Sequence, residues 1–543
     1  MNLTRRQFAK LSLAAVGATA LSGWGLSKGI GSIGSIPPIT GQIIGASAAL
    51  GHKLRTGGFP APNRTLEHDI VIIGGGIAGL GAAYILNKAG VENFTLLELE
   101  NHTGGNSSSG KNAVSAYPWG AHYVPLLTEE STAPRRLFEE LGIITGYEKG
   151  LPVYNDFYLC AAPHERLYRL GRWQDGLVPN VGTTAEEQAQ FKKFFVLMEG
   201  YKTAKGVDGR KAFAIPVDKS STDTVFRALD TLTMTDWLHQ HDLTAEPLHW
   251  YVNYCCRDDY GTLVSDTSAW AGIHYFAART GRAANADPQD VVTWPEGNGW
   301  LVEKLRNPQK TQVQTNALVY SVRKTPSSVA VDYYDASTRE TVRIEAKTAI
   351  MATPRFIAAR LTDGLSAEGF SYSPWAVANI TLKTLPKTGG APLSWDNVSY
   401  NSPLLGYVVA THQIPQAHPL KTVLTYYWPL THISPLEARK EALARSYQDW
   451  QDAFLQDLYT THPDLKGQVE HLDVCLWGHA MARPIRGFIW GKERQEALRQ
   501  EPPLFFAHSD MSGMSIFEEA YTHGVVAAEQ AMTYLRHPYQ SVL

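Results

Sequence analysis

The stretch His68-Asp69-Ile70-Val71-Ile72-Ile73-Gly74-Gly75-Gly76-Ile77-Ala78-Gly79 decides how this chain folds. Its apolar, β-branched first half predicts a buried strand, and the glycines after it predict a tight turn. Apolar residues then recur at helical spacing until Gly90 supplies a stop, which predicts a helix over residues 77–88. A second strand, residues 94–97, ends at Glu98. Strand, helix and strand together form a βαβ unit.

The glycines of this unit have the spacing that a bound dinucleotide requires. Gly74 allows the sharp turn, Gly76 lets the backbone approach a pyrophosphate, and Gly79 lets the helix pack closely on the strand. Ile77 and Ala78 are the first residues of the helix. Their free N–H groups and the positive end of the helix dipole face the phosphates. These five residues are therefore predicted to bind a dinucleotide.

The acidic residue at the end of the second strand is expected to hold the ribose. Glu98 follows Gly74 by 24 positions, close to the spacing of roughly 20 that is typical of this fingerprint. Its carboxylate can accept hydrogen bonds from the adenosine ribose hydroxyls and disfavours a 2'-phosphate. The fingerprint alone leaves both NAD and FAD open.

The next segment, Glu98-Leu99-Glu100-Asn101-His102-Thr103-Gly104-Gly105-Asn106, favours FAD. An acid followed six and seven residues later by a glycine pair resembles the amine oxidase, phytoene desaturase and protoporphyrinogen oxidase superfamily, where this loop wraps the FAD pyrophosphate. Those enzymes usually carry arginine where Asn106 stands. Ser107-Ser108-Ser109 follow it. The resemblance therefore implies that Gly104, Gly105 and Asn106 bind FAD through backbone and amide donors, with serine hydroxyls beside them instead of a guanidinium.

Further segments match this superfamily in the same serial order. Trp119-Gly120-Ala121-His122-Tyr123 resembles a turn beside the isoalloxazine ring, which implies that Ala121 and His122 contact the cofactor. Val319 lies where the family's backbone contacts adenine. Residues 348–354 resemble the family's return strand, which ends in Ala-x-Pro.

The end of the chain resembles the C-terminal FAD motif of the same superfamily. In that motif an acid holds the flavin ribitol, and a helix N-terminus faces the N1–C2=O edge. Asp510 supplies the carboxylate, although Ser509 replaces the usual glycine, and Ile516 stands at the start of the helix. No cysteine lies near Asp510, so the FAD is expected to be non-covalent.

These matches imply an α/β fold in which a Rossmann-like FAD-binding domain is assembled from discontinuous segments and joined to an α+β substrate domain. A β-meander is expected over residues 313–334. The FAD-binding segments are predicted at 66–125, 291–365 and 476–540, and the substrate domain at 126–290, mainly helical, and 366–475, sheet-bearing.

The first residues resemble a twin-arginine export signal. Arg5-Arg6 is followed by Phe8 and by an apolar run over residues 11–26 that is too short and glycine-rich for a stable membrane span. An ordinary secretory signal or an amphipathic start is the alternative. We predict a signal and flexible tether over residues 1–48, the twin-arginine translocase as a partner, no membrane span after processing, and a periplasmic or otherwise exported protein. Small-x-small cleavage sites occur at Ala18-Thr19-Ala20 and Ala46-Ser47-Ala48.

Composition favours a small-molecule substrate. The net charge is -3 over 543 residues, which gives no electrostatic attraction to nucleic acid. Four cysteines show no metal-ligand spacing, so neither a metal site nor a disulfide scaffold is predicted. The vicinal pair Cys255-Cys256 is interpreted as two small buried side chains rather than a redox element.

The expected reaction is transfer of a hydride equivalent from a small organic substrate to the flavin, which then reduces oxygen or another acceptor. Amine oxidases of the superfamily commonly use a lysine in a strand just after a proline. The comparable stretch, residues 374–381, has no lysine until Lys383. A desaturase or isomerase of a hydrophobic substrate, and a non-catalytic protein stabilised by FAD, therefore remain alternatives.

Aromatic and acidic residues are the candidates for the substrate pocket. His122, Trp477 and His479 come from segments expected to face the flavin. The acidic pair Asp258-Asp259 either attracts a cationic substrate or forms a solvated loop. The helical insert adds aromatic residues that suit either a substrate cage or the core, namely Tyr251, Tyr254, Tyr260, Trp270, His274 and Tyr275.

Overall fold

The predicted βαβ unit forms the centre of one of two sheets in the computed structural model, which describes residues 38–387, 389–414 and 420–543. Strand β2 (Arg64–Ile73) runs into the turn at Gly74, α4 (Ile77–Lys88) follows, and β3 (Phe94–Leu97) pairs in parallel with β2. The last residues of β2 are buried because both faces of this sheet are covered, as its unbroken β-branched run indicates. The predicted α/β class with a Rossmann-like domain is confirmed.

The nucleotide sheet has the order β12-β3-β2-β15-β14-β13, with β21 also paired to β15. Its parallel pairs bring the carboxyl ends of β2, β15 and β21 to one edge, where ligands bind in folds of this kind. The expected β-meander over residues 313–334 is present as β13 and β14, and it continues into β15. The strands are β12 (Val313–Gln314), β13 (Ala317–Lys324), β14 (Val329–Asp335), β15 (Glu340–Met351) and β21 (Leu504–Phe506).

Helix α16 (Phe517–Tyr534) packs against α4 on one face of this sheet. The contact is close because a Cβ at Gly524 would lie only 2.2 Å from the carbonyl oxygen of Ala78. Both helices therefore begin at the same sheet edge, although their sequences lie far apart. The other helices of this body are α5 (Thr132–Glu140), α11 (Gly299–Arg306), α12 (Arg355–Leu361) and α15 (Lys492–Ala497).

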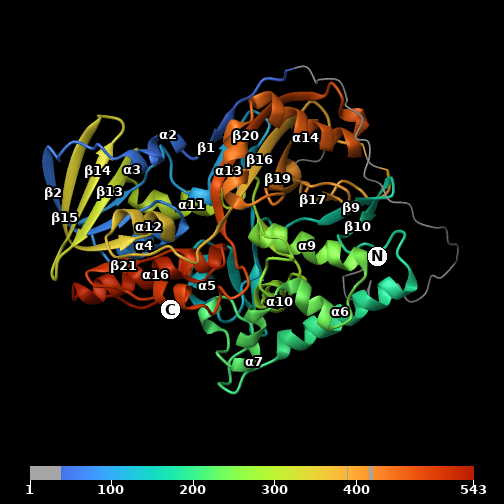
Figure 1. Cartoon of the computed structure of the whole chain (residues 1–543), viewed down its shortest axis with the longest axis horizontal. Coiled ribbons are helices and arrows are strands. Elements are labelled where there is room, and N and C mark those ends of the chain that lie inside the picture. Colours follow the sequence, from blue (N-terminus) through green and yellow to red (C-terminus); the bar gives the residue numbers. More distant parts are fainter. Residues whose placement is uncertain (1–37, 388, 415–419) are drawn as a thin grey trace.

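The second body is built on an eight-stranded sheet and lies beside the first in Figure 1. Its long central strand β16 is buried on both faces: Trp375 and Val377 belong to the core shared with the helical insert, whereas Ala376 and Ala378 belong to the core under α13 and α14. In order, the strands are β1 (Ile43–Gly45), β20 (Val469–Ala482), β16 (Tyr372–Leu382), β19 (Thr422–Pro429), β18 (Tyr407–Val409), β17 (Asp396–Ser399), β9 (Glu165–Arg169) and β10 (Arg172–Asp175).

The insert over residues 126–290 is mainly helical, as predicted, but its first part, with α5, packs into the core of the nucleotide domain instead of the predicted substrate domain. Its later part contributes β9 and β10 to the second sheet. The chain enters and leaves this insert at one place, because β6 (Tyr123–Pro125) before it pairs with β11 (Val291–Thr293) after it. Helices α6 and α14 begin at capping boxes, at Thr184 and Ser446. The helices of this body are α6 (Ala185–Thr203), α7 (Thr224–Arg227), α8 (Met234–Gln240), α9 (Glu246–Tyr260), α10 (Ala269–Ala277), α13 (Pro435–Ala444) and α14 (Tyr447–Thr461).

The structure shifts the predicted boundary at residue 476. Strand β20 continues through Ala482, and its pairing with β16 runs from Val469 to Ala482. Residues 476–482 therefore belong to the substrate-domain sheet. The third FAD-binding segment begins after them.

The second correction concerns residues 39–48, which we predicted as part of a flexible tether. Strand β1 pairs in parallel with β20, and the amide of Leu472 donates to the carbonyl of Thr40 at 3.0 Å. The chain continues through α2 (Ala48–Gly51) and α3 (Lys53–Thr56) toward the nucleotide sheet, so that residues 39–56 join the two bodies (Figure 1). We call this segment the N-terminal strap. Arg5-Arg6 and the rest of the predicted signal lie outside the described residues.

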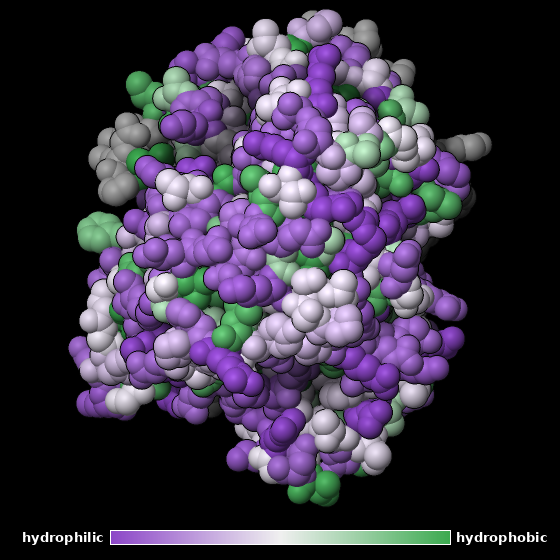
Figure 2. All heavy atoms as spheres, turned by 90° about the vertical axis from the view of Figure 1, so that its left-hand side faces the viewer, coloured by the Kyte–Doolittle hydropathy of each residue, from purple (hydrophilic) through white to green (hydrophobic). Residues whose placement is uncertain are grey.

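Within the part of the chain that the structure describes, no helix is both long and apolar enough to cross a membrane. The face shown in Figure 2 is mostly hydrophilic, with hydrophobic residues scattered singly or in small groups. Scattered apolar residues of this kind are ordinary on a protein surface.

The strap leads to a prediction about the mature N-terminus. A chain that begins at Pro38 should keep β1, whereas one that begins at Gly51 should lose at least seven hydrogen bonds to the second body, from or to Ile39, Thr40 and Gln42. At roughly 0.5–1 kcal/mol each, their loss should cost about 3–7 kcal/mol. Hydrogen exchange of residues 469–482 should therefore be faster in the shorter chain. Equal protection in both chains would contradict the assigned pairing.

Candidate functional site

The turn after β2 leaves open space where a dinucleotide phosphate would lie. A Cβ at Gly76 would meet no heavy atom within 4 Å, and one at Gly105 would meet only the Cα of Gly76, at 3.5 Å. In contrast, a Cβ at Gly79 would lie 1.8 Å from the carbonyl oxygen of Gly74. Gly79 is therefore required for packing, whereas Gly76 and Gly105 form a cradle that a side chain would fill.

A hydroxyl beside the cradle has no partner within the described residues. The Oγ1 atom of Thr353 is buried and makes no hydrogen bond to described atoms. Thr353 borders the turn, since its Cγ2 would lie 3.2 Å from a Cβ at Gly74. Buried polar groups are rarely left unsatisfied. The cradle and this hydroxyl both fit a bound dinucleotide.

Glu98 lies next to the same turn, as the fingerprint predicts. Its carboxylate accepts the amide of Gly75 at 2.6 Å and that of Glu100 at 2.9 Å. Burial raises the pKa of Glu98 to about 7, although the backbone N–H groups act in the opposite direction. The first residue of β13, Ala317, donates its amide to the carbonyl of Glu98, which brings the strand that carries Val319 to this site.

The turn at Gly104–Asn106 closes over the cradle. The amide of Gly104 donates to Gly75 at 2.8 Å, and that of Ala121 donates to Asn106 at 2.8 Å. The side-chain amide of Asn106 donates to the carbonyl of Ala480. Asn106 thus joins the turn to β20. We expected its side-chain amide to point at the cradle, and it does not.

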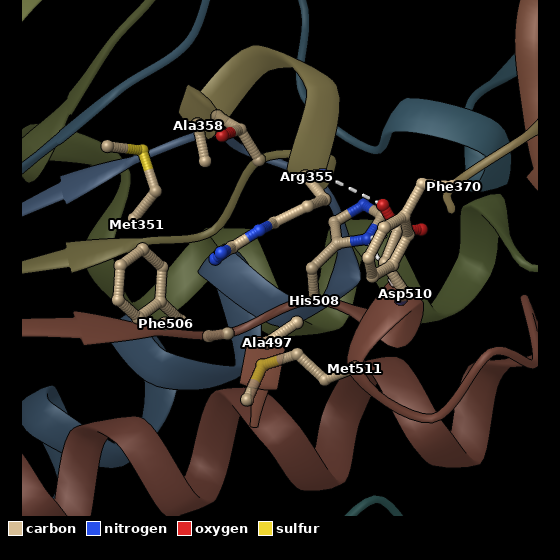
Figure 3. Close-up of a pocket in the computed structure, with 11 residues that line it drawn as sticks. Met351, Arg355, Ala358, Phe370, Ala497, Phe506, His508, Asp510 and Met511 are labelled. Atoms are coloured by element: carbon tan, nitrogen blue, oxygen red, sulfur yellow. Dashed lines mark hydrogen bonds and ion pairs between the residues drawn. The ribbon is translucent and has the colours of Figure 1, made fainter. Parts of the chain in front are cut away.

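Asp510 lies at the carboxyl end of β21 (Figure 3). Its Oδ2 atom accepts the hydroxyl of Tyr372 at 2.6 Å and the amide of Arg355 at 2.8 Å, and Oδ1 lies 3.0 Å from Nδ1 of His508. Burial by itself would raise the pKa of Asp510, but His508 and these hydrogen bonds hold it below its ordinary value. Asp510 is thus an ionised group fixed by its neighbours. The adjacent cavity, about 10 Å³, has room for one water molecule.

Helix α16 begins at Ile516 without a side-chain cap. Its first N–H groups are therefore available to a ligand at the sheet edge. Behind them, burial raises the pKa of Glu518 to about 7 and that of Glu519 to about 8. Both carboxyls thus keep protons near neutral pH, which limits their repulsion of an anion at this helix end.

His122 lies in a layer of aromatic rings. Its ring stacks on Tyr427 at 4.6 Å and lies 5.4 Å from Trp395, which contacts Tyr123 edge-on at 6.0 Å. The hydroxyl of Tyr427 donates to the carbonyl of Gly120 at 2.9 Å, which fixes the layer to the turn before His122. Burial lowers the pKa of His122 to about 4, so the ring is uncharged at neutral pH.

The three pocket candidates do not lie at one place. Trp477 donates its indole N–H to the carbonyl of Trp119 at 2.7 Å, and so lies beside the same turn as His122. His479 instead stacks on Phe356 of α12 at 4.3 Å. Trp477 therefore borders the aromatic layer, whereas His479 faces the nucleotide domain.

Most aromatic residues of the insert are core residues. Tyr251, Tyr260, Trp270 and His274 are buried in the main hydrophobic core or against it. Tyr254 differs, because its hydroxyl donates to Asp396 at 3.3 Å. Of the two roles that the sequence allowed for these residues, the structure therefore favours the core at most positions.

Asp258 and Asp259 lie in α9, so the alternative of a solvated loop is wrong. Asp259 is buried and paired with Arg279, which also lies over the ring of Tyr275. Asp258 is one helical turn after Tyr254 and so faces the same way. No described residue forms a hydrogen bond or ion pair with its carboxylate.

Asp396 and Glu165 complete an acidic cluster with Asp258. The two residues are directly opposite each other in the parallel strands β17 and β9, and Tyr254 links Asp396 to α9. Burial raises the pKa of Asp258 to about 7, with Asp259 adding to the shift. Burial also raises the pKa of Asp396 well above its ordinary value, with Glu165 and Asp258 contributing. Sequence analysis missed Asp396 and Glu165 because no local motif marks them.

The acidic cluster lies directly behind the aromatic layer. Trp395 immediately precedes Asp396 in the chain. Burial raises the pKa of Tyr427, and Asp258 and Asp396 add to this shift. All four cysteines are buried, as expected for Cys255-Cys256. Among the described residues, no cluster of side chains could hold a metal ion.

Comparisons with known proteins agree with this architecture. A family model described as an NAD(P)-binding Rossmann-like domain matches residues 72–141. No curated protein sequence matches the chain. Among solved structures, a wild-type putrescine oxidase bound to putrescine shows 18% identity and a TM-score of 0.63, over 86% of this chain and 100% of that one.

Two further solved structures share the fold. Cyclohexylamine oxidase from Brevibacterium oxydans shows 15% identity and a TM-score of 0.62, over 87% of this chain and 100% of that one. A fatty acid isomerase from P. acnes that produces CLA shows 16% identity and a TM-score of 0.57, over 86% and 98%. The chain therefore has the two-domain fold of these enzymes, built on a dinucleotide-binding domain.

The two glycines of the turn should respond differently to substitution. Gly76→Ala should fold with an unchanged melting temperature but lose most dinucleotide binding, because the methyl group occupies the cradle. Gly79→Ala should be destabilised by several kcal/mol, because its methyl group overlaps the Gly74 carbonyl. Thermal denaturation and cofactor content of the two purified variants test this. Gly76→Ala that retained its cofactor fully would contradict the assigned cradle.

Proposed function

We propose that this chain is an exported FAD-dependent oxidoreductase. Its proposed substrate is a diamine-like molecule, with one amine that is oxidised and a positive charge at the other end. The observation that carries the substrate assignment is the acidic cluster behind the aromatic layer of His122. Charged groups buried in this way need a counter-ion, and among the described residues Asp259 has a close ion pair with Arg279, whereas Asp258 has only the weaker, more distant attraction of Arg257 and Arg279.

FAD is the dinucleotide that best suits the cradle, given the resemblance in the segments around Gly104 and Asp510 and the fold shared with putrescine oxidase. When bound, FAD accepts a hydride equivalent from the substrate and passes electrons to oxygen or another acceptor. Gly76 and Gly105 would admit its diphosphate. Glu98 would bind the ribose, and Asp510 the ribitol.

The aromatic layer and the acidic cluster would bind opposite ends of the substrate. The rings of Tyr427 and Trp395 exclude water and can stabilise a cation through their faces. His122 is uncharged at neutral pH, so it does not repel a protonated substrate. Asp258, Asp396 and Glu165 would hold the distal positive charge.

A desaturase or isomerase of a hydrophobic molecule is the second candidate. The site has no lysine in β16, since Lys383 follows the strand and lies exposed near Gly467. The shared fold also includes a fatty acid isomerase. Buried carboxyl groups disfavour this candidate, because an apolar substrate would offer them no hydrogen-bond partner or counter-ion.

The purified protein should be yellow and should release FAD on acid precipitation. Under anaerobic conditions a diamine should bleach the flavin faster than a monoamine of the same chain length, and faster than a polyunsaturated lipid. Stopped-flow absorbance measures these rates. Bleaching by the lipid alone would support the second candidate, and no bleaching by any of these substrates would favour a structural role for FAD.

Diamine affinity should increase as the pH rises through about 7. Below this value Asp258 is protonated and neutral, and above it the carboxylate attracts the distal cation. Asp258→Asn should remove this pH dependence and raise the diamine KM about tenfold, the effect of roughly 1.4 kcal/mol. The monoamine KM serves as the control and should change little. An equal rise for both substrates would show that Asp258 does not bind the distal charge.

Export through the twin-arginine pathway is proposed from Arg5-Arg6 and from the need to bind FAD before translocation. Replacing both arginines with lysine should leave FAD-loaded precursor in the cytoplasm. Cell fractionation with flavin fluorescence tests this. Unchanged export would mean that another signal operates.

A further inference from the structure

Five basic residues lie on segments that meet beside the nucleotide turn. They come from three parts of the chain that meet there: the N-terminal strap, α12 of the nucleotide domain, and the α13 and β20 elements of the substrate domain. We call them the basic cluster, and its members are His52, Arg55, Arg360, Arg439 and His479.

The substrate domain contributes Arg439 and His479. The guanidinium of Arg439 donates to the carbonyl of Tyr372 at 3.1 Å, and its Cδ would lie 3.6 Å from a Cβ at Gly478. His479 follows Gly478 and stacks on Phe356. Arg439 thus lies against the backbone beside His479, and among the described residues it donates to carbonyl oxygens rather than to carboxylates.

The nucleotide domain and the strap supply the other members. Arg360 lies one helical turn after Phe356 in α12 and so shares the face that meets His479. The strap is held over the end of β3, because Ser47 donates twice to Glu100, at 2.8 Å and 2.7 Å. Arg55 follows in the exposed helix α3.

The positive charges of the cluster are not balanced by neighbouring carboxylates. Burial lowers the pKa of His479 to about 4, and Arg439, Arg55, His52 and Arg360 add to the shift. Burial and Arg55 also lower the pKa of Arg439. Across the described ranges, the three arginines form no ion pair. Such an arrangement is costly unless an anion binds there.

Each part of the chain that carries the cluster also borders the cradle. Ala480, the residue after His479, accepts the amide of Asn106. Thr353, three residues before Phe356, lies beside the Gly74 turn, and a Cβ at Gly51 of the strap would lie 3.6 Å from Leu99. The basic cluster and the cradle therefore share the same edge of the nucleotide domain.

We propose that the basic cluster binds the diphosphate of the dinucleotide, with Arg55 of the N-terminal strap as a direct ligand together with Arg360 and Arg439. This rests on the proposed function, which supplies the dinucleotide. The Gly104–Asn106 turn itself offers no cationic side chain, since the amide of Asn106 is used by Ala480. The strap thus completes the cofactor site as well as the substrate-domain sheet.

The test measures flavin binding by the full mature chain. FAD release from diluted holoprotein, and rebinding of FAD or riboflavin to the stripped protein, are followed by flavin fluorescence. Arg55→Gln and Arg360→Gln should each weaken FAD binding about tenfold at low salt, as expected for a charge-assisted hydrogen bond. The difference from wild type should shrink at high salt. Riboflavin, which lacks phosphate, should bind all variants equally.

Lys53→Gln is the matched control, because Lys53 lies in the same short helix but places its ammonium over the ring of Tyr334, at 4.7 Å. It should bind FAD like wild type. Unchanged FAD affinity in Arg55→Gln and Arg360→Gln would overturn the inference. This would hold even if the two variants reduced a negatively charged electron acceptor at a different rate. Equal weakening of FAD and riboflavin would also overturn it. Failure of the wild-type chain to bind FAD would instead contradict the proposed function.

Discussion

The parallel pairing of β15 with both β2 and β21 is the constraint on which the cofactor site depends. It brings three turns from distant parts of the sequence to one sheet edge, at Gly74, Ala352 and Ala507. The close approach of α4 to α16 then sets the two helix starts side by side. Without this alignment, Glu98 and Asp510 would not border the same space.

Two clusters of side chains of like charge type lie near the candidate site. Carboxylates of Asp258 and Asp396 are buried behind the aromatic layer, and arginines gather beside the nucleotide turn. Both arrangements oppose stability when no ligand is bound, because buried or crowded like charges repel each other. Ligands of opposite charge would remove this repulsion, so binding and stability should be coupled in this protein.

The sequence predicts the nucleotide domain well because its signals are local. The β-branched run before Gly74, the helix over 77–88 and the acid at Glu98 follow one another within one βαβ unit, and the structure has the helix at the predicted bounds. The substrate site is harder to predict. Asp396, Glu165 and Tyr427 come from strands that meet only through sheet pairing, and nothing near them in sequence marks their role.

The predicted tether failed for a related reason. Residues 39–48 are rich in glycine and small side chains, which locally favour flexibility, yet β20 offers an unpaired edge that β1 completes. The same misreading placed residues 476–482 in the wrong domain, because a motif boundary was taken from the resemblance while the strand continues through it. Long-range pairing decided both cases.

The pairing of β1 with β20 also constrains the order of events during synthesis. Ile43 pairs with Val474, more than 400 residues later, so the N-terminal strap cannot dock until nearly the whole chain has left the ribosome. Docking of the strap is therefore a late step, because it requires that the distant strand β20 is already in place. A nascent or truncated chain would keep its N-terminal segment undocked, which gives the cell a physical difference between finished and unfinished molecules.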